Sequence, residues 1–100
     1  INIVDNFVTR KVSAIVLAPL DREALVKPVT TAMSRGVPVV IVDSGLDSED
    51  VVSTISTDNY NGGKIAAQHV GKVLDGKGSV VVLRYQVGSE STEQREKGFI

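Results

Sequence analysis

Three short apolar runs, rich in β-branched residues, most constrain how this chain folds. They occupy residues 14–18, 39–42 and 80–83. Each run is too short for a helix and nearly free of polar residues, which is typical of a strand that is buried on both faces of a sheet. Residues 51–56 mix apolar and small polar side chains and are predicted to form an edge strand.

Helical patterns lie between these runs. The segment 3–8 places its apolar residues on one helical face. In the next stretch, Asp21 can cap a helix and Gly36 can end it in the left-handed conformation. Pro28 falls inside this stretch and is expected to kink the helix.

Two more helices are predicted further along the chain. Asp58 can cap a helix over residues 59–74, and Gly62 and Gly63 would permit close packing of this helix on a sheet. Its apolar stripe consists of Ile65, Ala66, His69, Val70 and Val73. Residues 91–94 have the Ser-Thr-Glu-Gln pattern of a capping box, which opens a last helix. The alternation of strands and helices predicts an α/β fold with doubly wound parallel sheets and helices on both faces.

Charge and composition disfavour several classes of function. Eleven basic and twelve acidic residues give a net charge of −1, so we expect neither a nucleic-acid partner nor an anionic-membrane surface. There is no cysteine, which removes thiolate metal sites and cysteine nucleophiles. No apolar run approaches the roughly 20 residues of a membrane-spanning helix, so no membrane insertion is expected. The pattern includes no phosphate loop, and we expect no cofactor and no metal.

The carboxyl ends of the predicted strands nominate a ligand site, because ligands of such sheets bind beyond those ends. The rule selects residues 18–20, 43–45 and 85–87. Asp43 either caps the turn that follows it or accepts hydrogen bonds from a ligand, and the residues alone leave both interpretations open. Gln86 is a weaker candidate on the same edge.

Arg95 lies about one turn into the last predicted helix, whose start faces the same edge. Its guanidinium carries five N–H donors in a rigid fork, which can bridge neighbouring hydroxyl groups. A solvated arginine explains the position as well, because other charged side chains share the segment. The residues alone do not decide between these interpretations.

Four segments resemble the periplasmic type I sugar-binding proteins, the ribose-binding group most closely, and more distantly the ligand domains of LacI-type repressors. They are VLAPLD (16–21), GVPVVIVDS (36–44), TDNYNGG (57–63) and STEQREKGF (91–99). The resemblance runs in unbroken order over nearly the whole chain. It implies a fold of two α/β lobes with the ligand held in the cleft between them.

The resemblance also implies a division of the chain. Residues 1–56 would form the later part of the first lobe, and residues 57–100 the crossover and the start of the second lobe. The chain begins without methionine and stops at Ile100 within a helical pattern, so we expect a fragment of a longer protein.

The cleft aspartate of the family corresponds to Asp43, and its sugar-binding arginine corresponds to Arg95, since residues 95–99 match the motif Arg-x-x-Gly-Phe without gaps. The chain departs from the pattern at Ala18, where ribose binders usually carry asparagine. The resemblance therefore does not imply that the ligand is ribose. The complete candidate ligand-binding set is Asp43, Arg95, Ser44, Gln86 and Ala18.

The implied function is that of the solute-binding component of a sugar ABC transporter, which holds a monosaccharide and is read by a membrane permease. The implied location is periplasmic or extracellular, with a lipid anchor as one option. The alternative is the effector-binding domain of a LacI-type transcriptional regulator. An enzyme is disfavoured because the predicted edge carries no nucleophile–base pair.

Overall fold

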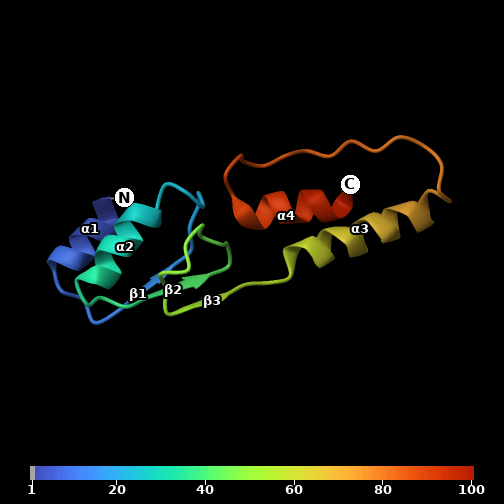
Figure 1. Ribbon diagram of the computed structural model, residues 1–100. Helices are drawn as coiled ribbons and strands as arrows, with labels where there is room; N and C mark the ends of the chain where they lie inside the picture. Colours follow the sequence, from blue (N-terminus) through green and yellow to red (C-terminus); the bar gives the residue numbers. More distant parts are fainter. Residues whose placement is uncertain (1) are drawn as a thin grey trace.

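The structure is a computed structural model that describes residues 2–100. Its elements are α1 (Asn2–Thr9), β1 (Ile15–Leu17), α2 (Val26–Ser34), β2 (Val39–Val42), β3 (Ser53–Ile55), α3 (Asn59–Val73) and α4 (Glu90–Phe99). They form two groups that lie end to end (Figure 1). We call residues 2–55 the N-terminal half and residues 59–100 the C-terminal half. The molecule is elongated, with principal extents of 56 × 20 × 17 Å.

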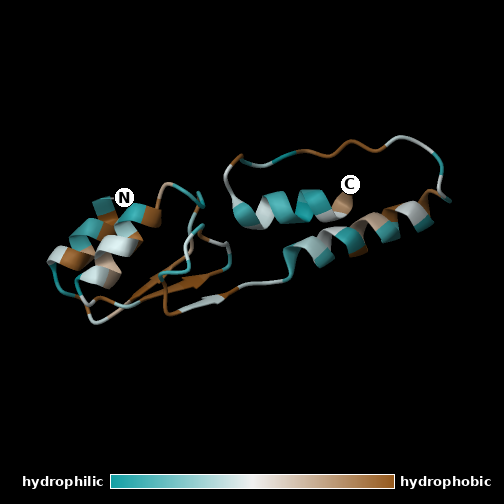
Figure 2. Ribbon diagram, viewed as in Figure 1, coloured by the Kyte–Doolittle hydropathy of each residue, from teal (hydrophilic) through white to brown (hydrophobic). Residues whose placement is uncertain are grey.

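The N-terminal half is a three-stranded sheet with α1 and α2 on one face (Figure 1). The strands lie in the order β1-β2-β3, and both neighbouring pairs are parallel. Because side chains alternate across a strand, Val39 and Ile41 point to the same face, where both are fully buried together with Val29 of α2. The strands predicted at residues 14–18, 39–42 and 51–56 are thus confirmed, and Figure 2 shows β1 and β2 as strongly hydrophobic.

The second helix differs from the prediction at its start. The Asp21 carboxylate accepts hydrogen bonds from the backbone N–H groups of Glu23 and Ala24, both at 2.9 Å. These bonds hold the pKa of Asp21 below its ordinary value. They cap a turn and not the predicted helix, because α2 begins only at Val26. Pro28 therefore lies in the first helical turn, where a missing N–H costs nothing, and the predicted kink does not arise. The left-handed end at Gly36 is confirmed by its φ of +79°.

In the C-terminal half, α3 and α4 pack side by side through two glycines (Figure 1). A Cβ atom on Gly63 would collide with the backbone carbonyl of Arg95 in α4. A Cβ atom on Gly98 would collide with the carbonyl of Tyr60 in α3. The two helix backbones are therefore in direct contact, and Gly63 permits helix-to-helix packing where helix-to-sheet packing was expected.

One strand predicted for this half does not form among residues 2–100. The run 80–83 forms no strand, and its side chains are exposed, Val81 by 83% and Leu83 by 90%. A strand needs a neighbouring strand to take up its backbone hydrogen bonds, and none of the described strands lies beside this segment, which Figure 2 shows as a hydrophobic loop. The predicted apolar stripe of α3 lies on an uncovered face, with Ile65 57% and Val73 70% exposed.

The start of α3 is capped as predicted. Asp58 is the N-cap residue, and its Oδ1 atom accepts a hydrogen bond of 3.0 Å from the backbone N–H of Asn61. We expect Asp58→Ala to lower the free energy of unfolding of the intact protein by about 1 kcal/mol, because this N–H loses its partner. Asp58→Ser keeps a side-chain oxygen and is the control. Equal losses for both variants in urea denaturation would contradict the capping role.

Candidate functional site

The carboxyl end of β2 is shaped by an unusual backbone conformation at Asp43. The backbone N–H of Asp43 donates to the Ile55 carbonyl at 2.9 Å, which continues the pairing with β3. The N–H of Ser44 then donates to the Val42 carbonyl at 2.8 Å, which closes a three-residue turn around Asp43. Asp43 has a φ of +68°, a region that few residues other than glycine adopt, although aspartate tolerates it better than most. The chain turns sharply here and leaves the Asp43 side chain exposed beyond the sheet.

The residue after Asp43 connects the two halves. The Ser44 hydroxyl is buried and accepts a hydrogen bond of 3.2 Å from the backbone N–H of Ser91 in the first turn of α4. The Ser91 carbonyl in turn accepts a hydrogen bond of 3.2 Å from Nε of Arg95. A short chain of contacts therefore runs from the turn at Asp43 to the guanidinium of Arg95.

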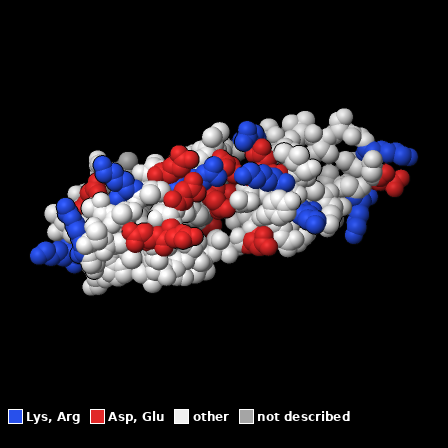
Figure 3. All heavy atoms as spheres, in the orientation of Figure 1, with Lys and Arg blue, Asp and Glu red and all other residues white. Residues whose placement is uncertain are grey.

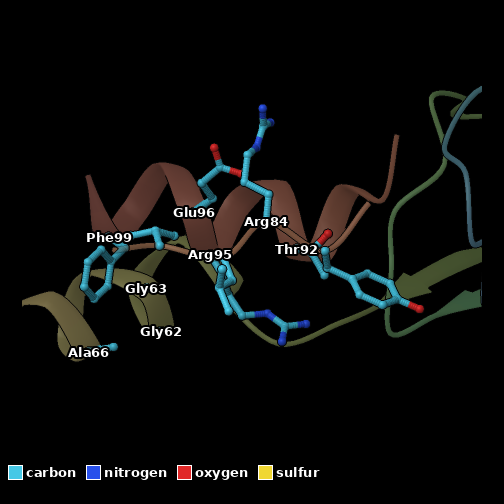
Figure 4. A pocket seen from close by; sticks show the side chains of 11 residues that line it. Gly62, Gly63, Ala66, Arg84, Thr92, Arg95, Glu96 and Phe99 are labelled. Carbon is cyan, nitrogen blue, oxygen red and sulfur yellow. The ribbon is translucent and has the colours of Figure 1, made fainter. Parts of the chain in front are cut away.

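Arg95 also lines a hollow of about 340 Å³ in the C-terminal half. The hollow lies between α3, α4 and residues 82–85. Figure 4 shows the Arg95 side chain pointing away from the paired side chains of Arg84 and Glu96, whose closest N–O distance is 2.7 Å. Asp43 is not among the residues that line this hollow.

Further polar contacts surround the Ser44–Ser91 hydrogen bond. Gly45 donates its backbone N–H to Glu90 Oε2 at 3.1 Å. Arg22 donates its backbone N–H to the Gly88 carbonyl at 2.9 Å, and its guanidinium Nη1 lies 3.2 Å from Glu93 Oε2. We call this contact region, formed by residues 22, 44–47 and 88–93, the junction. Figure 3 shows acidic groups, with basic groups among them, gathered over the middle of the molecule where the two halves meet.

Glu93 and Arg22 also interact with residues of their own half. Glu93 Oε1 accepts the backbone N–H of Gly88 at 2.8 Å, and this bond, assisted by the positive charge of Arg22, holds the pKa of Glu93 below its ordinary value. The glutamate thus reaches back to the residue before the N-cap Ser89, and the capping box predicted with Ser91 as its first residue does not form. Arg22 Nε lies 3.4 Å from Asp47 Oδ2.

The remaining sequence candidates lie apart from these contacts. Ala18 follows β1 at the carboxyl edge of the sheet and is exposed. Gln86 is exposed in the long connection between α3 and α4. Sequence analysis missed Arg22 and Glu90, because ordinary charged residues in a turn and at a helix start carry no signal that sets them apart from solvated ones.

Asp43 and Arg95 carry complementary hydrogen-bonding groups in the two halves. Asp43 offers a carboxylate acceptor from one half, and Arg95 offers guanidinium donors from the other. Hydrogen bonds to charged groups are stronger than those between neutral groups.

The whole chain, residues 1–100, matches the periplasmic binding protein domain family, and the chain belongs to this family. It is 30% identical over 95 residues to the xylitol-binding protein of Mycolicibacterium smegmatis, with 95% of this chain and 27% of the relative covered. It is also 30% identical over 96 residues to the ribose import binding protein of Bacillus subtilis, with 96% and 32% covered. The chain thus spans about a third of the length of these curated relatives.

Solved structures are similar over 98% of the chain. A carbohydrate transporter solute-binding protein from Agrobacterium radiobacter, in complex with D-arabinose, has a TM-score of 0.92 at 39% identity, with 35% of that protein covered. An ABC transporter solute-binding protein from Agrobacterium vitis, with bound D-fucose, has a TM-score of 0.92 at 40% identity, with 35% covered. The resemblance read from the sequence motifs and the predicted α/β class with parallel strands are both confirmed.

Proposed function

We propose that this chain is part of the solute-binding component of a sugar ABC transporter, and that it helps to hold a monosaccharide in a cleft between two lobes. The observation that carries the proposal is the hydrogen bond between Ser44 and Ser91, which joins the turn at Asp43 to the helix of Arg95. Sugar-bound solved structures at 39% and 40% identity support it. The protein would bind its ligand without changing it.

The division into lobes belongs to the same proposal. Residues 1–56 would be the later part of the first lobe, and residues 57–100 the crossover and the start of the second. The separate packing of the two halves supports this boundary, since α1 packs on α2 and α2 on β2, while α3 packs on α4. Residues 56–58 join the halves without helix or strand.

The mechanism is capture by closure. Asp43 would accept hydrogen bonds from sugar hydroxyls on one side of the cleft, and Arg95 would donate them from the other, with Ser44, Gln86 and Ala18 as further wall residues. A ligand that bridges both sides favours the closed arrangement over the open one. A membrane permease would recognise the closed form, in a periplasmic or extracellular location. No helix among residues 2–100 is long and apolar enough to cross a membrane.

The proposal is tested by calorimetry on the intact protein with D-arabinose, D-fucose, D-ribose and xylitol. We expect at least one of these compounds to bind with a dissociation constant in the micromolar range or below, and to remain chemically unchanged after incubation. Absence of binding for all four, or conversion of any of them, would contradict the proposal. Sugar-dependent binding of the intact protein to DNA would favour the LacI-type alternative.

A further inference from the structure

We propose that the ion pair between Arg22 and Glu93, together with the backbone hydrogen bonds around it, holds the two halves closed and so positions Asp43 against Arg95 without touching the ligand. The inference rests on the proposed function, because it concerns the closure of the same site. It assigns a role to four residues outside the ligand-binding set. They are Arg22, Asp47, Glu90 and Glu93.

The junction is built from contacts between protein groups alone. Arg22 is its central residue, since it bonds the C-terminal half through its backbone N–H and through its guanidinium. Its carbonyl accepts the backbone N–H of Asp47 at 2.9 Å, which fixes Arg22 to the loop that follows Asp43. The side chain of Glu93 is only 14% exposed, so its attraction to Arg22 is less screened than that of a surface pair.

The site lies next to these contacts in the chain. Ser44 directly follows Asp43, and Ser91 lies one helical turn before Arg95, with which it shares a hydrogen bond. The distance across the junction therefore sets the gap between the two charged candidates. A residue that strengthens the junction changes ligand affinity through this gap, as a positioning residue.

The covalent connection between the halves within this chain is short and irregular. Residues 56–58 carry no regular secondary structure and are exposed, and they form the only covalent link between the halves among residues 2–100. The α3–α4 pair makes its main helix contacts internally, as do the elements of the N-terminal half. Within residues 2–100, the hydrogen bonds and the ion pair of the junction are loop and helix-terminus contacts between the halves.

Gly88 shows how closely the segments approach at this point. Its φ is +90°, and a Cβ atom there would lie 2.6 Å from Oδ2 of Asp21. A side chain at this position would be strained by the positive φ and would displace the Asp21 carboxylate. The segment before α4 therefore passes close to the Asp21 carboxylate, next to Arg22 in the sequence.

The test measures closure in the intact protein without any sugar. This chain supplies no competing cysteine, so Lys11→Cys and Lys77→Cys, at exposed positions in the two halves, can carry a pair of fluorophores for single-molecule energy transfer. We expect Arg22→Met to lower the closed-to-open ratio about threefold to tenfold, the range expected when a partly exposed ion pair with supporting contacts is lost. Glu93→Gln should lower it similarly, and the double variant should add little, because both changes remove the same pair.

Arg10→Met is the matched control. It removes the same charge from an exposed residue that forms no ion pair within residues 2–100, and it should leave the ratio unchanged. An unchanged ratio for Arg22→Met, or a ligand-free protein in which every molecule is open, would overturn the proposal. A lowered ratio in a protein that binds none of the four test sugars would leave closure by the junction intact and count against the proposed function alone.

Discussion

Replacing Gly63 by alanine is expected to destabilise the C-terminal half by at least about 2 kcal/mol, at the upper part of the range for overpacked contacts. The added Cβ would meet the Arg95 carbonyl and lie 3.0 Å from the Arg95 Cα. A flexible side chain could turn aside, but a helix backbone cannot, so α3 and α4 must separate. Because the collision is with Arg95 itself, we also expect sugar affinity to fall.

Gly62→Ala is the matched control for this prediction. Gly62 is exposed on the same helix, and a Cβ atom there meets nothing within 4 Å. Both substitutions gain the helix propensity of alanine, about 1 kcal/mol in an exposed helix interior. Gly62→Ala should therefore be neutral or stabilising in urea denaturation of the intact protein. Equal stabilities for the two variants would show that α3 and α4 do not pack through Gly63.

The predictable parts of the fold are the strands that are buried by a helix adjacent to them in the sequence. The runs at residues 14–18 and 39–42 became neighbouring strands because α2, which connects them, covers the face that holds Val39 and Ile41. The run at residues 80–83 has the same composition, yet it forms no strand. Composition makes a strand favourable, but a partner strand must supply the hydrogen bonds, and the pattern of one segment cannot show whether that partner is present.

Some residues of the candidate site could be proposed from the sequence, and others are found only in the structure. Asp43 and Arg95 could be proposed because one ends an apolar strand and the other lies in a motif that resembles a known family. The contacts between Ser44 and Ser91, or between Gly45 and Glu90, join residues 47 and 45 positions apart. Serine and glutamate are common at turns and helix starts, where local capping explains them. Only the folded arrangement distinguishes such a residue from one that bonds across the junction.

Removing either charged candidate is expected to weaken sugar binding by the intact protein at least tenfold, about 1.4 kcal/mol. Arg95→Ala removes donors whose sugar partners would be left unpaired in a closed cleft, which costs more than the net value of the bond. Lys97→Ala, on the same helix and without an ion pair in the described part of the chain, is the control for charge and helix propensity. It should bind as the unmodified protein does.

The Asp43 variants need a separate design because of the backbone at this residue. With a φ of +68°, alanine would strain the turn after β2, whereas asparagine tolerates this conformation. Asp43→Ala should therefore lose both affinity and some stability, while Asp43→Asn should keep the stability and still lose affinity, because an amide accepts more weakly than a carboxylate. Calorimetry measures the affinity and urea denaturation the stability. If Asp43→Asn and Arg95→Ala both bind sugar as tightly as the unmodified protein, neither side chain contacts the ligand, and the cleft walls must be assigned to other residues.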